Sequence, residues 1–253
     1  NIYDLVMRQG VHPGLSASQM WAGVFDLPTD RSREHDDLVV ECLQAYRGEL
    51  AATRAALVAQ GCTDQMLEPA FARLAEVSSP AVMHSEWRGM RSPITAAEVR
   101  ITLAWAAWAM PDQESQLEVQ ALKALSDDID ELEASAKADG VSPFMRALAL
   151  RNVALMRSAL RVYGIRGVAA VNDALQTAAG AAVAQRPIIE AEVANGTPQT
   201  KTVASRLRSV MDVAVKAAEG VDKFNKGIEA GKSVYKVLRE VWDALPSLPP
   251  PGT

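Results

Sequence analysis

Apolar residues recur along this chain at the three- and four-residue spacing of helices, and no convincing alternating run predicts a strand. One stripe from Val39 to Leu57 predicts a helix over residues 33–60, with Ser32 as its cap and Gly61 as its stop. The same spacing, with caps and breaks, predicts further helices at residues 2–9, 17–25, 64–77, 95–110, 112–139, 142–163 and 165–185, and a short one around His84 and Trp87. The expected fold class is therefore all-α: an orthogonal multi-helix bundle with a long C-terminal helix or helical hairpin.

The helix predicted over residues 95–110 has no polar face after Arg100, and it holds Trp105 and Trp108 close to one side. A helix that is apolar all round is usually buried. We therefore expect this helix at the centre of the bundle, with both tryptophans in the core. The apolar stretch is about half of the ~20 residues needed to cross a bilayer, so it does not predict a membrane span.

Residues 186–200 contain Pro187, the pair Asn195-Gly196 and Pro198, which are residue types that favour turns and loops. We therefore predict a linker here. The expected organisation is a helical bundle domain at residues 1–185, a linker at 186–200, a helical extension at 201–245 and a proline-rich tail at 246–253. Such a tail favours an extended chain.

Apolar residues between positions 202 and 245 are spaced alternately by four and three, which is the 3.5-residue period of a coiled-coil seam. Gly220 leaves two forms open: one long helix, or a hairpin of helices 202–219 and 221–245. In either form the seam must be covered by the body, by a second copy or by a partner. Its large members, which we take as candidate partner-binding residues, are Val203, Leu207, Val210, Val221, Phe224, Ile228, Tyr235, Leu238 and Trp242.

The net charge of −5 is unevenly spread, with an acidic first part to residue 140 and a basic remainder. The simplest interpretation is that the halves attract each other, with Arg146, Arg157, Arg161 and Arg166 facing the acidic helix around residues 127–133. An anionic partner for these arginines is the alternative. The basic half lacks the density of Lys and Arg expected of a nucleic-acid interface. We therefore expect no nucleic-acid partner.

The two cysteines, Cys42 and Cys62, lie inside and just beyond the predicted helix 33–60, about 30 Å apart at ~1.5 Å rise per residue. That distance excludes a disulfide within this unit and favours a reducing, cytoplasmic compartment. The excess of Arg over Lys and the abundance of Ala are typical of a GC-rich bacterial genome. The start at Asn1 rather than Met indicates a processed form or a fragment.

Candidate catalytic chemistry is sparse. Gly231-Lys232-Ser233 has the end of a phosphate-binding loop, but the spacing of its glycines is too short and a helical pattern precedes it. His12, His35 and Asp36 resemble the metal ligands of the all-helical HD-type phosphohydrolases, and imidazole with carboxylate suits a divalent metal. The neighbouring acids Glu34 and Asp37 fit equally well as solvated side chains in the first turn of a helix, where the helix dipole favours them. We therefore predict no catalytic residue, no cofactor and no metal, with His12, His35 and Asp36 as weak metal candidates.

Residues 143–180, which are less than a fifth of the chain, resemble helical modules of bacterial conflict and phage-defence proteins. The residues that carry this resemblance are Leu148, Leu160, Tyr163, Gly164, Gly167, Leu175 and Gly180. The first functional hypothesis is a non-enzymatic interaction or oligomerisation protein that acts through residues 202–245, in such a system. Two alternatives stay open: a membrane-active, pore-forming-like helical effector, whose C-terminal lysines suit a membrane surface, and an HD-like metal-dependent phosphohydrolase.

Overall fold

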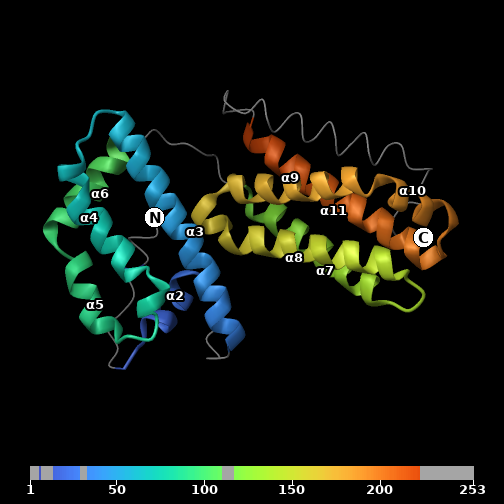
Figure 1. Ribbon diagram of the computed structural model, residues 1–253, viewed down its shortest axis with the longest axis horizontal. Coiled ribbons are helices and arrows are strands. Elements are labelled where there is room, and N and C mark those ends of the chain that lie inside the picture. The colour runs from blue at the N-terminus through green and yellow to red at the C-terminus, as the bar shows by residue number, and fades with distance from the viewer. Residues whose placement is uncertain (1–5, 7–13, 29–32, 110–116, 223–253) are drawn as a thin grey trace. The chain divides into compact units, whose positions relative to one another are not determined.

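The computed structural model describes residues 6, 14–28, 33–109 and 117–222, and over these ranges the chain forms ten α-helices and no strand. The predicted all-α fold is therefore confirmed (Figure 1). The chain separates into two compact units. Unit 1 comprises Asn1–Gln113 with Gly164–Arg166, and unit 2 comprises Glu114–Tyr163 with Gly167–Thr253. The units divide near residues 113 and 164–166, whereas the sequence predicted domain boundaries at residues 185 and 200.

Unit 1 is a bundle built around one central helix. Its elements are α2 (Ala17–Val24), α3 (Arg33–Ala59), α4 (Asp64–Val77), the 3-10 turn η1 (Pro80–Val82), α5 (Trp87–Ile94) and α6 (Ala97–Ala109). The helices predicted at residues 33–60 and 64–77 are thus confirmed. The short helix expected around His84 is misplaced, because His84 lies in the turn before α5. The central helix is α4, which packs against α3, α5 and α6.

Aromatic packing around Trp21 holds the core of unit 1 together. The Trp21 ring stacks on Phe25 at 5.4 Å between centroids and meets the rings of Tyr46 at 5.6 Å and Trp87 at 6.4 Å. These spacings lie in the favourable range for aromatic pairs. The Trp21 indole Nε1–H donates to the Val77 carbonyl at 3.1 Å, which satisfies the polar end of the buried ring. One side chain therefore ties α2, α3, α5 and the end of α4 together.

The expectation that the helix at residues 95–110 forms the centre of the bundle is wrong. Helix α6 packs on α4 through one side only, where Val99 and Ala106 are buried. Its other side leaves Trp108 81% exposed and Ile101 68% exposed. The all-round apolar pattern could not show this, because it does not say which side of a helix receives a neighbour.

Unit 2 is a second bundle. It contains α7 (Val119–Lys137), α8 (Pro143–Arg166) except for its last three residues, α9 (Val168–Ala184), α10 (Arg186–Asn195) and α11 (Pro198–Asp222). Helix α11 packs on α7, α9 and α10, and α8 lies beside α7, to which it is joined by ion pairs (Figure 1). The helix predicted over residues 142–163 extends further, to Arg166. It ends at Gly167, whose φ of +56° favours glycine.

Ion pairs between α7 and α8 confirm part of the predicted internal charge pairing. The Arg157 guanidinium bonds to Asp130 at 2.7 Å and to Glu133 at 2.5 Å. Hydrogen bonds from Lys137 and Arg157 lower the pKa of the Glu133 carboxyl. Arg146 instead donates to the Ala138 carbonyl at 3.0 Å. The acidic helix α7 and the basic helix α8 are thus joined by ion pairs at the protein surface. Each such exposed pair contributes under about 1 kcal/mol to the stability of the fold.

The linker predicted at residues 186–200 is wrong in its secondary structure, because most of it is helix α10. Pro187 occupies the first turn of α10 and Pro198 begins α11, positions where the missing N–H has no intrahelical partner to lose. Ile189 and Val193 are four residues apart and both buried. The prolines and Asn195-Gly196 therefore start and stop helices here.

The extent of α11 tests the two forms predicted for the C-terminal region, one long helix or a hairpin that turns at Gly220. It is continuous through Gly220 to Asp222, so the hairpin turn predicted at Gly220 is wrong. The chain beyond Asp222, including the predicted proline-rich tail, lies outside the described residues.

Candidate functional site

The first half of the heptad seam is covered by the chain's own unit 2. Val203, Leu207 and Val210 are at most 1% exposed, and Ala214 is fully buried. The helix that carries them lies along α7 and α9. The expectation of an open apolar seam is therefore corrected over this stretch: these side chains fill a core and present no surface to a partner. The side chain of Val221, and the residues Phe224, Ile228, Tyr235, Leu238 and Trp242, lie outside what the structure describes.

Two of the three weak metal candidates, His35 and Asp36, lie within the described residues and are not part of a metal site there. His12 lies outside the described residues. The His35 ring is buried, with Nδ1 against the Pro28 carbonyl and Nε2 3.4 Å from Ser18 Oγ. Both ring nitrogens thus face protein groups. Across the described ranges, no group of three His, Cys, Asp or Glu side chains could hold a metal ion. The Gly231-Lys232-Ser233 stretch lies outside those ranges.

The most conspicuous exposed feature of unit 1 is one face of α6, which we call the α6 outer face. Its residues recur at helical spacing, so they line a single side of the helix. They are Ala97, Ile101, Ala104, Trp105 and Trp108, all of them exposed. The residues of the opposite side, Val99 and Ala106, belong to two separate core clusters of unit 1. One side of α6 is therefore packed into the core of unit 1, and the opposite side is apolar and exposed.

A charged pair flanks the start of this face. The Glu98 carboxylate pairs with Arg73 on α4. A hydrogen bond from its own backbone N–H, together with the bond from Arg73, lowers the pKa of Glu98. Arg100 is exposed beside it. From Ile101 to Ala109 the helix carries no charged side chain, so the charged residues of α6 lie near its start.

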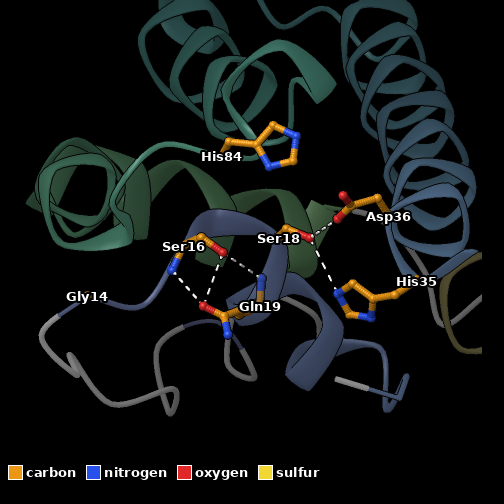
Figure 2. A pocket seen from close by; sticks show the side chains of 7 residues that line it. All are labelled: Gly14, Ser16, Ser18, Gln19, His35, Asp36 and His84. Atoms are coloured by element: carbon orange, nitrogen blue, oxygen red, sulfur yellow. Dashed lines mark hydrogen bonds between the residues drawn. The ribbon is translucent and has the colours of Figure 1, made fainter. Parts of the chain in front are cut away.

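A second feature of unit 1 is a polar cavity of about 290 Å³ between α2, the start of α3 and the turn before α5 (Figure 2). Its wall consists of Gly14, Ser16, Ser18, Gln19, His35, Asp36 and His84. Ser18 Oγ donates to Asp36 Oδ1 at 2.8 Å. Ser16 caps α2 through a capping box with Gln19. Sequence reasoning found His35 and Asp36 but missed Ser18. The Ser-x-x-Gln pattern could have located the cap at Ser16. No local sequence signal indicates that Ser18 bonds to Asp36 of α3.

None of the helices within the described residues combines the length and the apolar character needed to cross a bilayer. No protein-family model, curated protein or solved structure matches this chain.

Proposed function

We propose that this chain is a non-enzymatic interaction protein that assembles with a second copy of itself through the α6 outer face. The observation that carries the proposal is the exposure of Trp108, 81%, beside Ile101, 68%, and Trp105, 36%, on one side of one helix. Exposed tryptophans clustered in an apolar patch are typical of binding surfaces. This keeps the class of function that the sequence suggested and moves its surface from the C-terminal seam to α6.

The pattern along α6 suits another helix as the occupant. Ile101, Ala104, Trp105 and Trp108 follow the i, i+3, i+4, i+7 spacing of helix-in-groove recognition. In an antiparallel pair of α6 helices, the small Ala104 lies near the twofold axis, where the backbones approach closely. Ile101 of one copy then lies beside the partner's Trp108. The same patch serves both copies, as a twofold interface requires.

The size of the patch sets the expected strength. A buried tryptophan removes roughly 150–250 Å² from water, and burying one large apolar side chain stabilises a complex by about 1.5–3 kcal/mol. Helix α6 is about 20 Å long at ~1.5 Å per residue. Two such helices bury less than the ~1,600 Å² of a standard interface. We therefore expect a reversible dimer with a dissociation constant in the roughly micromolar range.

Sedimentation equilibrium of the whole chain over a wide concentration range tests the proposal. The expected result is a monomer–dimer equilibrium that Trp108→Glu and Ile101→Glu each abolish, because a charge would have to be desolvated at the interface. Ile188→Glu is the matched control, since Ile188 is a 49% exposed apolar residue in unit 2. It should leave the equilibrium unchanged. A monomer at every concentration would refute the proposal.

Truncation distinguishes this surface from the C-terminal part of the seam. Removal of residues 198–253 would strip α11 from the core of unit 2, so the informative chain ends after Asp222. We expect that chain to dimerise as the whole protein does. If truncation abolishes the dimer and Trp108→Glu does not, the assembly surface lies beyond Asp222 and the α6 proposal is wrong.

A further inference from the structure

The polar cavity of unit 1 contains a carboxylate that no cation neutralises within the described part of the chain. Asp36 is half-buried, accepts one hydrogen bond from Ser18 at 2.8 Å and forms no ion pair with a described Lys or Arg. A carboxylate removed from bulk water is stabilised by a positively charged partner. Figure 2 shows Asp36 directed toward the cavity from the first turn of α3.

Two serine hydroxyls of the wall, those of Ser16 and Ser18, can accept hydrogen bonds beside Asp36. Ser18 Oγ has a single proton, which it gives to Asp36 at 2.8 Å, and lies farther from His35 Nε2, at 3.4 Å. The acceptors that the wall offers to a ligand are therefore the Asp36 carboxylate and these two hydroxyl oxygens.

An anion is a poor occupant, although the cavity lies at the start of α2, where helices often bind anions. The backbone N–H groups that an anion would use are already bonded. Ala17 N–H donates to the Ser85 carbonyl at 2.9 Å and Ser18 N–H to the Met83 carbonyl at 2.7 Å. Gln19 N–H donates to Ser16 Oγ at 3.3 Å. The first turn of α2 is thus closed to phosphate or carboxylate.

We propose that this cavity binds a small organic cation whose ammonium or guanidinium group pairs with Asp36. Its N–H groups donate to the Asp36 carboxylate and to the serine hydroxyl oxygens, and its short alkyl part lies below His84. His84 is exposed and lies across the cavity from Ser16 and Gln19 (Figure 2). A volume of about 290 Å³ is at the lower end for ligand pockets, so the ligand is smaller than a drug-sized molecule.

A set of probes of one size and different charge tests the ligand class. Butylammonium and ethylguanidinium present the two proposed cationic groups, butyramide is the neutral analogue and butyrate the anionic one. Titration of the whole protein, followed by calorimetry, should show saturable binding of both cations and none of butyramide or butyrate. The affinity should fall as sodium chloride is added, because salt screens a partly exposed charge pair. Binding of butyrate, or equal binding of all four probes, would contradict the proposal.

Asp36→Asn is the decisive variant, because it removes the charge while keeping the shape and an oxygen for the Ser18 hydroxyl. We expect it to weaken cation binding at least tenfold. Asp37→Asn is the matched control: Asp37 is the next residue on α3, is exposed and is not part of the cavity wall. It should bind as the unchanged protein does. Equal loss in both variants would mean nonspecific attraction to the acidic helix start and would overturn the site.

His84→Ala provides an independent check that does not depend on the stability of α3. His84 lies in an exposed turn, so its removal should leave the helical circular dichroism and the melting temperature unchanged. Because it covers the alkyl part of the ligand, its loss should weaken butylammonium binding about threefold or more. An unchanged affinity would remove His84 from the site, and with it the proposed position of the ligand.

Discussion

Replacement of Leu207 by alanine distinguishes a core residue from an interface residue. Leu207 belongs to the heptad seam that the sequence offers as an assembly surface. In the structure it is 1% exposed, on the side of α11 that packs against α7 and α9. If the seam is core, the substitution destabilises each molecule by itself. If it were an interface, the loss would depend on the protein concentration, because association stabilises by mass action.

The expected loss follows from the burial. Removing a leucine side chain from a fully packed site costs about 2–5 kcal/mol, the transfer term and the cavity term together. Native domains are stable by only about 5–15 kcal/mol, so such a loss is a large fraction of the total. For a chain of this size each kcal/mol lowers the melting temperature by roughly 2–4 °C. We therefore expect a fall of about 5–15 °C in the transition of unit 2.

Urea unfolding followed by far-ultraviolet circular dichroism, at low and at high protein concentration, measures this loss. Lys216→Ala is the control, since Lys216 is exposed on the same helix. It should change the free energy of unfolding by less than about 0.5 kcal/mol. A loss below about 1 kcal/mol for Leu207→Ala, or one that disappears at high concentration, would show that the seam is not the core of unit 2.

Further predictions concern single side chains and the backbone. Burial raises the pKa of Tyr46 in the folded protein, so its contribution to stability is full below about pH 10 and is lost as the pH rises through the folded value. Urea unfolding at alkaline pH should show this loss, and Tyr46→Phe should reduce it. Cys42 and Cys62 are buried and not joined to each other, so a colorimetric thiol titration should detect them only after denaturant is added. Gly167→Ala forces a side chain into positive φ and should destabilise the protein by more than about 1 kcal/mol. Gly164→Ala, in a helix with open space at the new Cβ, should instead stabilise it by about 0.5–1 kcal/mol in the same assay.

Much of the fold was predictable because helix formation depends on local features. The stripe of Val39, Leu43 and Leu57 predicted α3 almost to the residue, and all three side chains are buried. Pro187 and Pro198 show where local reasoning failed. Proline breaks a helix in its interior but suits its first turn. The sequence alone did not separate these two uses, and a helix was predicted as a linker.

The candidate sites were far less predictable. His35 and Asp36 are adjacent in the sequence, which suggested a pair of metal ligands. Their roles are set by Pro28 and Ser18, residues of other segments whose positions depend on the packing of α2 on α3. Trp108 was expected in the core because it is large and apolar. It is exposed because α4 packs on the opposite side of α6.

The sequence by itself determined that this chain is helical, where most of its helices lie and which residues form each apolar stripe, because backbone propensity, capping and periodicity act within a few turns. The tertiary structure decided which apolar stripe is buried against another helix and which stays exposed to solvent. The seam of α11 is buried by its own unit, while the apolar outer face of α6 stays open to water. The physical reason is that burial is a property of pairs of surfaces, and the partner of a given stripe is chosen by packing between segments far apart in the chain.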